Sequence, residues 1–431
     1  MNKEVNVARK PPANWSLQPA EEALLMLLRR ALFSAELKSG ELSKPIRWEM
    51  VFDEARRQAV LPLAVDAAVS LPEALRPPES VRASAVNDAI LQVTNNERLM
   101  MVQDELIQIL NRSGIPYAIL KGTSAAARYP KPELRVQGDI DVLVNEGDLD
   151  PAIGALSKSG YQLMPSDASY DVKLYKDNIR VEVHRAVSDI PLGEAGDFIR
   201  TALTGTLASG KPVSIEDHSF IILADKHQAL SLLLHMRFHL LGSGLGLRQL
   251  CDYALFVHRV NKQTWEEEIT PILRQSGLWR FAAILAKTCH LYLGLPLADC
   301  PWCMDADEAA CAKVIADFFS SGNFGSKDPG RIPSAVLSAG REKPNTNRYN
   351  PMNLIRNLNA NARKNFPICV MFPVLLPAMW VYLPIRYYIR MKTGKRRYQP
   401  VGDILNSAHE REALFKEFGL FQPEEELRGK N

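Results

Sequence analysis

Apolar residues recur at the three-to-four-residue spacing of an amphipathic helix over most of this chain. In the clearest case, one apolar stripe is formed by Leu230, Leu233, Leu234 and Phe238. The spacing predicts helices over residues 19–39, 48–71 with a break at Pro62, 80–113, 148–159, and throughout 218–294.

Between residues 114 and 190 the pattern changes to short runs typical of strands. These runs cover residues 116–120, 139–144, 161–164, 171–175 and 179–184, with a hairpin turn at Lys176-Asp177-Asn178. Strand and helix do not repeat in a regular series, so we expect antiparallel or mixed pairing. The predicted fold class is α+β, with a small mixed or antiparallel sheet flanked by helical segments.

Two aspartates lie one residue apart inside the run 139–144. Side chains of a strand alternate between its faces, so Asp139 and Asp141 project together, opposite Ile140 and Val142. Two such carboxylates repel each other unless a cation lies between them. Mg²⁺ and Mn²⁺ suit oxygen ligands and also bind nucleotide phosphates. A solvated strand end is the simpler interpretation of an isolated Asp-x-Asp pair.

A glycine turn lies between the run 116–120 and a stretch of small residues, Thr123 to Ala127. A strand, a glycine turn and a helix start form an anion site, because the first N–H groups of a helix lack partners within it. Lys121 and Gly122 occupy the turn. The alternative for Lys121 is a strand-end side chain in solvent.

A third carboxylate, Glu182, lies in the run 179–184, where it shares a face with Arg180 and His184. On a strand beside Asp139 and Asp141 it would complete a metal site or act as base for an acceptor hydroxyl. The alternative is an exposed side chain paired with Lys173 or Arg180.

These segments together resemble the bacterial uncharacterised nucleotidyltransferase family, within the DNA-polymerase-β-like nucleotidyltransferase superfamily. The resemblance is carried by Leu120-Lys121-Gly122, Tyr129-Pro130, Arg135, Asp139-Ile140-Asp141 and Val181-Glu182-Val183-His184. It covers roughly residues 20 to 330 and includes the stretch 227–255 and the phrase Gly322-Asn323-Phe324-Gly325. The superfamily places Gly-Gly or Gly-Ser at the first turn, whereas this chain has Lys121-Gly122-Thr123.

The resemblance implies a metal role for three carboxylates. Asp139 and Asp141 would bind one or two Mg²⁺ (or Mn²⁺) ions and the nucleoside triphosphate. Glu182 would be the third metal-site carboxylate and would deprotonate the acceptor.

The resemblance also implies a set of nucleotide-binding residues. Gly122 would let the backbone approach the phosphates. Lys121, Thr123 or Ser124 would replace the usual serine contact, and Lys121 and Arg135 would neutralise the β- and γ-phosphates. Arg135 has an alternative role, a structural pair with Asp139 or Asp141.

Length and charge set the wider frame. The 431 residues suggest several domains, and the net charge of +3 argues against a nucleic-acid partner. The N-terminus lacks the apolar core of a secretory signal, so we predict a cytoplasmic protein. The predicted parts are a flexible N-terminus (1–18), a helical segment (19–113), a nucleotidyltransferase core (114–200), a helical domain (201–320), a loop-rich linker (321–365) and an apolar, basic C-terminal segment with a tail helix (366–431).

Three other features leave alternatives open. The cluster His235, Arg248 and Asp252 either faces the nucleotide or acceptor or forms an interhelical hydrogen-bond network. Cys300 and Cys303 have metal or redox spacing, or are ordinary thiols. The apolar stretch 366–385, followed by basic residues up to 397, packs on the protein, contacts a membrane surface or spans it.

We therefore predict a Mg²⁺-dependent enzyme that moves a nucleoside monophosphate from an NTP to an unknown acceptor hydroxyl and releases pyrophosphate. Two other classes stay open: a non-catalytic nucleotide sensor with the same fold, and a membrane-proximal assembly protein that works through residues 366–397.

Overall fold

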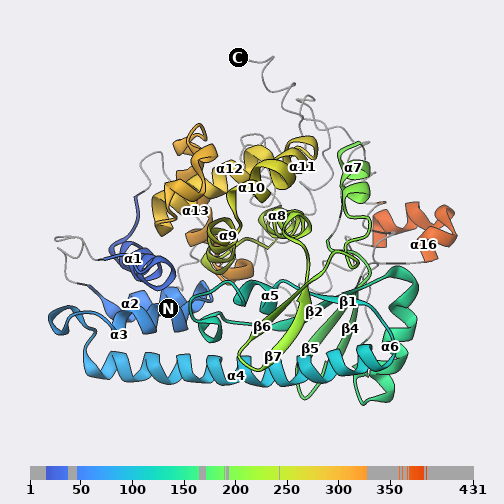
Figure 1. The fold of residues 1–431 in the computed structure, drawn as a ribbon, viewed down its shortest axis with the longest axis horizontal. Coiled ribbons are helices and arrows are strands. Elements are labelled where there is room, and N and C mark those ends of the chain that lie inside the picture. Colours follow the sequence, from blue (N-terminus) through green and yellow to red (C-terminus); the bar gives the residue numbers. More distant parts are fainter. Residues whose placement is uncertain are drawn as a thin grey trace.

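The computed structural model describes residues 16–36, 46–164, 171–188, 190, 194–241, 243–327, and parts of 359–385. It has the predicted α+β architecture, a seven-stranded mixed sheet surrounded by helices (Figure 1). The flexible N-terminus falls almost entirely outside the described residues, as do most of the linker and the tail helix.

Among the described residues, four α-helices precede the sheet: α1 (Pro19–Phe33), α2 (Trp48–Arg57), α3 (Leu61–Val69) and α4 (Glu79–Arg112). The stretch predicted over 80–113 is thus one continuous helix. The break expected at Pro62 is wrong in position, because α2 ends before it. Pro62 lies in the first turn of α3, where no backbone N–H donor is needed.

The strands are ordered β3-β4-β5-β2-β1-β7-β6 in the sheet. Their bounds are β1 (Tyr117–Leu120), β2 (Asp139–Val144), β3 (Gln162–Leu163), β4 (Asp171–Lys176), β5 (Ile179–His184), β6 (Lys211–Ile215) and β7 (His218–Ile222). The central pairs β2–β5 and β1–β7 are parallel, and the other neighbours are antiparallel. The mixed sheet and the β4–β5 hairpin are confirmed.

The last two strands correct the prediction of helices from His218 onward. β7 occupies residues 218–222 and pairs with β6 across a short turn in which Glu216 has φ 50°. The sheet therefore extends into the range predicted as the helical domain.

The two faces of the sheet differ in chemistry. Ile140, Val142 and Val181 pack on one face, in a core that also holds Leu106 of α4 and Leu156 of α6 (Leu149–Lys158). The opposite face carries the acidic residues of β2 and β5, and α5 (Gly122–Ala126) and α8 (Asp225–Leu241) lie on that side (Figure 1).

The remaining helices build a second core above that face. They are α7 (Glu194–Ala202), α9 (Leu247–Arg259), α10 (Lys262–Thr264), α11 (Thr270–Gln275), α12 (Trp279–Thr288) and α13 (Glu308–Ser321), with π-turns at Trp265–Ile269 and Cys289–Leu293. Short 3-10 turns cover Glu73–Leu75, Pro132–Leu134, Glu146–Asp148, Leu297–Asp299, Pro301–Cys303, Asn323–Gly325 and Pro373–Leu375. Buried side chains of α1, α3, α9, α12 and α13 form one continuous cluster, so the first helices pack on the last.

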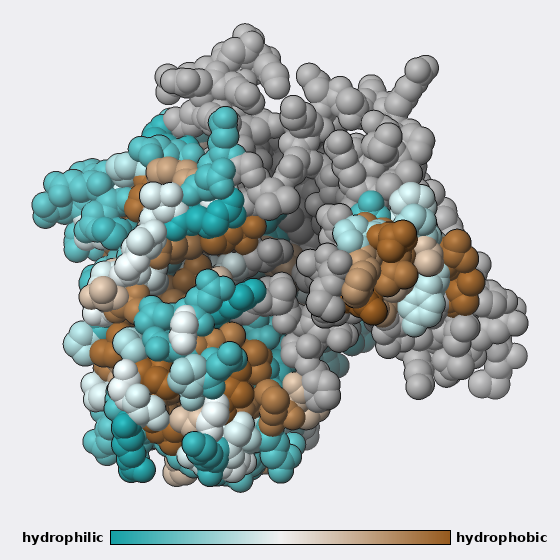
Figure 2. Space-filling model, turned by 90° about the vertical axis from the view of Figure 1, so that its right-hand side faces the viewer, coloured by the Kyte–Doolittle hydropathy of each residue, from teal (hydrophilic) through white to brown (hydrophobic). Residues whose placement is uncertain are grey.

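The described part of the C-terminal segment includes α16 (Ile368–Met371). Cys369 and Leu376 are buried with Ala362, in a small cluster separate from the other cores. Phe372 and Val374 are exposed, and apolar atoms gather on the surface of this segment (Figure 2). Among the described helices, none combines the length and the hydropathy that crossing a membrane requires.

Candidate active site

The three predicted carboxylates lie on two neighbouring strands, and two of them, Asp141 and Glu182, are paired in register. β2 and β5 run parallel, and the register places Asp141 beside Glu182 and Asp139 beside Arg180. Leu120, at the end of β1, pairs with Asp141 from the other side, so the turn at Lys121 follows immediately. The period-two alternation therefore places Asp139 and Asp141 of β2 and Glu182 of β5 on one face of the sheet.

Asp141 is buried between two nitrogen groups. Lys121 Nζ lies 3.2 Å from its Oδ1, and His184 Nε2 lies 2.7 Å from the same atom. Burial by itself raises the pKa of Asp141, but Lys121 and the His184 hydrogen bond outweigh it and hold the pKa far below its usual value. The carboxylate is therefore ionised throughout the physiological range.

Glu182 and Asp139 share one cation. Arg180 forms an ion pair with Asp139, and its Nε lies 3.4 Å from Glu182 Oε1, while Lys173 Nζ lies 3.7 Å from the same oxygen. The alternative pairing partners predicted for Glu182 are thus both present. Burial, followed by the charges of Asp141 and Asp139, raises the pKa of Glu182. The pKa of Asp141 is thus lowered and that of its neighbour Glu182 is raised.

Converging donor atoms identify a possible metal site. One ligand atom each from Asp141, Glu182 and His184 lies within 4.8 Å of the other two, and no other such group of His, Cys, Asp or Glu occurs in the described part of the chain. Asp139 belongs to the predicted metal set but lies outside this group. His184 was not predicted as a ligand, although its position two residues after Glu182 places it on the same face.

A further buried carboxylate lines the same cavity. Asp171, on β4, pairs in register with His184, and its Oδ1 is buried without a hydrogen-bond partner in the described structure. A buried, unsatisfied carboxylate oxygen is costly unless a cation or another donor reaches it. The donor set, carboxylates plus one imidazole, thus fits a divalent cation.

The turn at Lys121 has an unusual backbone. Lys121 has φ 43° and ψ −138°, a combination that residues with a side chain rarely adopt, and Gly122 follows with φ 25°. A Cβ on Gly122 would lie 3.5 Å from the Asp139 carbonyl oxygen, so the turn passes close to β2. Strain of this kind concentrates at ligand-binding sites.

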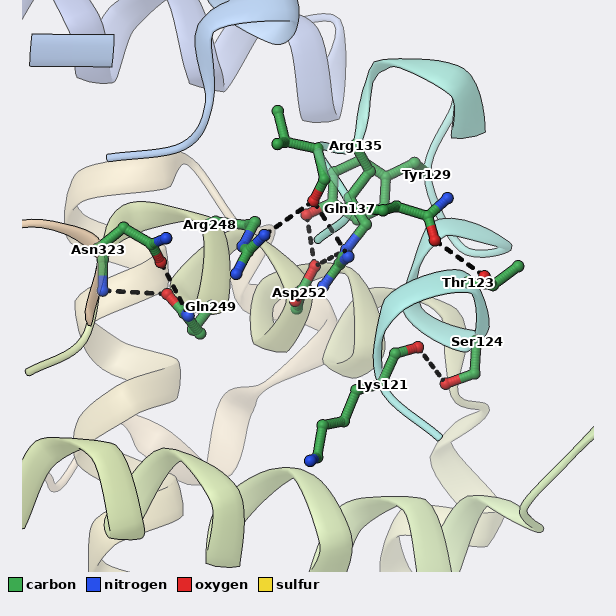
Figure 3. Close-up of polar contacts among 12 residues, drawn as sticks. Lys121, Thr123, Ser124, Tyr129, Arg135, Gln137, Arg248, Gln249, Asp252 and Asn323 are labelled. Atoms are coloured by element: carbon green, nitrogen blue, oxygen red, sulfur yellow. Dashed lines mark hydrogen bonds and ion pairs between the residues drawn. The ribbon is translucent and has the colours of Figure 1, made fainter. Parts of the chain in front are cut away.

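The two hydroxyls after the glycine hold the turn. Thr123 Oγ1 donates to Gln137 Oε1 at 2.8 Å, and Ser124 Oγ donates to the Lys121 carbonyl at 2.8 Å (Figure 3). Thr123 and Ser124 are both buried, and of the two only Ser124 lines the cavity, together with Lys121 and Gly122.

Arg135 makes a buried ion pair, but its partner is neither Asp139 nor Asp141. Its Nε and Nη2 donate to the two oxygens of Asp252 on α9, at 3.0 and 2.7 Å (Figure 3). Tyr129 also donates to Asp252, at 2.7 Å. The predicted alternative, a structural pair of Arg135 with Asp139 or Asp141, is therefore wrong in its partner, which is Asp252 of α9. Arg135 still borders the cavity.

The cavity, of about 290 Å³, lies between the sheet and the helical part. Its helical wall includes His235, His239, Arg248 and Phe324. Burial, then the charges of Lys121 and Arg248, lower the pKa of His239 to about 3, so this imidazole is neutral at pH 7. The predicted cluster of His235, Arg248 and Asp252 therefore borders the cavity, and Asp252 also belongs to a hydrogen-bond network.

Arg248 differs from the other cavity cations of the described structure. Its Nη1 donates to the Val136 carbonyl at 2.9 Å, but no carboxylate lies within ion-pair distance. By contrast, Lys121, Arg128, Arg135, Lys173 and Arg180 each have an acidic partner. The helical wall therefore presents a positive charge to the cavity.

Comparison with known families agrees with this geometry. The model of the family described as uncharacterised nucleotidyltransferase matches residues 44–294, more than half of the chain. The chain belongs to this nucleotidyltransferase family. The match includes the Lys121 turn, both aspartates, Glu182 and Arg248. No curated protein matches the chain.

The cysteines lie apart from this site. Cys300 and Cys303 are buried in a loop between helices, with 3.7 Å between their sulfur atoms, and both are free thiols. Among the described residues they join no third ligand to form a metal group.

Proposed function

We propose that this nucleotidyltransferase moves a nucleoside monophosphate from an NTP to an acceptor hydroxyl, with Mg²⁺ bound by its carboxylates. The proposal depends mainly on one observation: Asp141 and Glu182 lie side by side on parallel strands, next to the strained turn at Lys121. Three acids beside a turn suited to phosphate are what metal-assisted phosphate chemistry requires.

Asp139, Asp141 and Glu182 supply the oxygen ligands that Mg²⁺ prefers. When bound, the metal supplies charge neutralisation to the α-phosphate and the leaving pyrophosphate. His184, 2.7 Å from Asp141, orients that carboxylate or serves as a nitrogen ligand if Mn²⁺ replaces Mg²⁺.

Glu182 is the proposed base. Its raised pKa makes it a better proton acceptor than Asp141, whose pKa is depressed. The acceptor oxygen gives its proton to Glu182 and forms a bond to the α-phosphorus. The bond from that phosphorus to the bridging oxygen breaks, and pyrophosphate leaves with the electron pair.

Cations on both walls neutralise the triphosphate. Lys121 lies at the sheet wall and Arg248 at the helical wall, and both charges act on His239 between them. Gly122 and Ser124 border the cavity at the turn, and we assign them to the phosphates. Thr123 and Arg135 support the turn and the opposite wall through their buried hydrogen bonds.

Label transfer tests the reaction. The protein is incubated with Mg²⁺, a small-molecule extract as source of acceptors, and NTP labelled at either the α- or the γ-phosphate. We expect only the α-label to move to a new product. We expect Glu182→Gln to lower the rate by about 10²–10⁴-fold while NTP binding persists.

The controls separate metal binding from folding. Asp139→Asn combined with Asp141→Asn should abolish Mg²⁺-dependent NTP binding in calorimetry, whereas Asp53→Asn, at an exposed position of α2, should not. Transfer of the γ-label would show phosphoryl transfer instead. NTP binding with no transfer of either label would favour the nucleotide sensor.

We also propose a peripheral membrane contact through residues 366–397. Phe372, Val374, Val381 and Tyr382 are exposed on the described part. The following residues 386–397 contain six basic and no acidic side chains. Apolar insertion next to a basic stretch suits an anionic lipid surface. In a sedimentation assay with phosphatidylserine vesicles, the full chain should be found with the vesicles in the pellet. The double variant Val374→Asp with Val381→Asp should stay in the supernatant. Equal binding to neutral vesicles would contradict the charge component.

A further inference from the structure

Phe324 has a backbone conformation that residues with a side chain seldom adopt. It lies in the turn after α13 with φ 52° and ψ 37°, in the left-handed region. Its side chain is 40% exposed although it borders the cavity of the active site. A large apolar ring kept open to the site, on a strained backbone, calls for a functional explanation.

The turn that carries Phe324 is held in place from several directions. Gln249 Nε2 donates to Asn323 Oδ1 at 3.0 Å (Figure 3), and Ser326 Oγ donates to the Arg57 carbonyl at 3.0 Å. Two glycine contacts add to this. A Cβ on Gly246 would lie 2.8 Å from Asn323 Cα, and one on Gly325 would collide with the Ser243 carbonyl. The ring is thus held where it is by packing that only small residues permit.

The neighbours of the ring are also fixed. The His239 ring centroid lies 4.5 Å from that of Phe324, and the Arg248 guanidinium carbon lies 5.4 Å from it. His239 is uncharged at pH 7 and stacks on the ring in a tilted arrangement. The helical wall of the cavity therefore holds an aromatic surface beside a cation.

We infer that Phe324 is the stacking platform for the base of the nucleotide. This inference rests on the proposed function, because the phosphates must lie at Lys121 and the metal carboxylates for the base to reach the helical wall. A nucleobase is a planar ring, and aromatic side chains in nucleotide sites bind such rings face to face. An apolar acceptor would need an enclosed pocket, whereas this ring borders a cavity shared with charged groups.

The side-chain amide of Gln249, which lies next to this turn, already makes two hydrogen bonds within the protein. Gln249 Nε2 is occupied by Asn323, and Gln249 Oε1 accepts the Gly246 N–H at 3.0 Å. Stacking alone does not distinguish bases, because every base has a π-face. We therefore expect ATP, GTP, CTP and UTP to bind with dissociation constants within about tenfold of one another.

Calorimetry with the full chain and Mg²⁺ tests the platform. The ligands are the four NTPs and, as a ligand without a base, inorganic tripolyphosphate. Phe324→Gly removes the ring and favours the left-handed turn, so the turn should survive. We expect it to raise the Kd of every NTP about 5- to 150-fold and to leave the Kd of tripolyphosphate unchanged. Phe324→Tyr keeps the ring and should bind NTPs as the wild type does.

Each contrary result has its own meaning. Unchanged NTP binding by Phe324→Gly would overturn the platform and leave the proposed function standing. An equal loss of tripolyphosphate binding would also overturn it, because the turn would then support the phosphate site. If the wild type bound no NTP, the proposed function would be refuted, and the stacking platform with it.

Discussion

Replacing Asp252 with alanine separates the structural role of Arg135 from a role in nucleotide binding. Both side chains of the pair are 6% exposed, and two hydrogen bonds, at 2.7 and 3.0 Å, join them. Without Asp252 the Arg135 guanidinium is left buried and unpaired, which costs about 3–5 kcal/mol. Tyr129 also loses its acceptor, for about 1 kcal/mol more.

The assay is urea unfolding followed by circular dichroism. We expect Asp252→Ala to lower the free energy of unfolding by about 4–6 kcal/mol, the sum of the costs at Arg135 and Tyr129. The matched control is Asp66→Ala, which breaks the ion pair with Lys131. That pair is exposed (53% and 36%), so its loss should cost about 1 kcal/mol or less. A loss for Asp252→Ala as small as that of the control would refute the reasoning.

A double variant completes the test. Arg135→Met with Asp252→Leu replaces the pair by apolar side chains of similar size and should recover most of the lost stability. If Arg135 serves only the structure, the double variant binds NTP like the wild type. Recovered stability with a much weakened NTP affinity would show that Arg135 also contacts the phosphates.

Three further outcomes follow from the cavity. Arg248→Met should raise the Kd of tripolyphosphate about tenfold or more by calorimetry, because a charge-assisted hydrogen bond is lost, while Arg248→Lys recovers part of it. His239 has a folded-state pKa of about 3, below its ordinary 6.5, so the unfolded chain binds its proton first and stability is lost as the pH falls through 6.5 toward 3. His239→Gln lacks this titration. From pH 7 to pH 5, the free energy of unfolding of the variant should therefore rise by about 1–2 kcal/mol relative to that of the wild type. Gly122→Ala should lower the melting temperature and weaken NTP binding, because φ 25° is strained for alanine, and unchanged values would contradict the role of this turn.

The carboxylates could be predicted because their relation is local and periodic. Asp139 and Asp141 share a strand face by alternation alone, and the same rule joins Glu182 to His184. The same alternation also places His184 beside the acids, although the sequence pattern does not distinguish a ligand histidine from a buried structural one. The placement of β5 beside β2 followed from the family resemblance rather than from the spacing.

The contacts of the helical wall could not be predicted from the sequence, for a physical reason. Asp252 lies 117 residues from Arg135, and nothing local marks one as the partner of the other. β6 and β7 lack a clear strand pattern: β6 is a mostly exposed edge strand that contains Pro212, and β7 ends three residues before α8 begins. Phe324 belongs to a phrase that resembles the family, but only the contacts of its ring with His239 and Arg248 show where the ring lies.

The distribution of charge explains why both halves of the chain are needed. A sheet carrying Asp139, Asp141 and Glu182 would by itself repel a triphosphate, since like charges a few ångströms apart cost several kcal/mol at low dielectric. Arg248 comes from α9 and has no carboxylate partner within ion-pair distance in the described structure, so its charge remains available to an anion. In the proposed function, the sheet would provide ligands for a cation and the helical wall would provide the positive charge that admits the triphosphate. Substrate binding should accordingly weaken with rising salt, and less steeply in Arg248→Met than in the wild type.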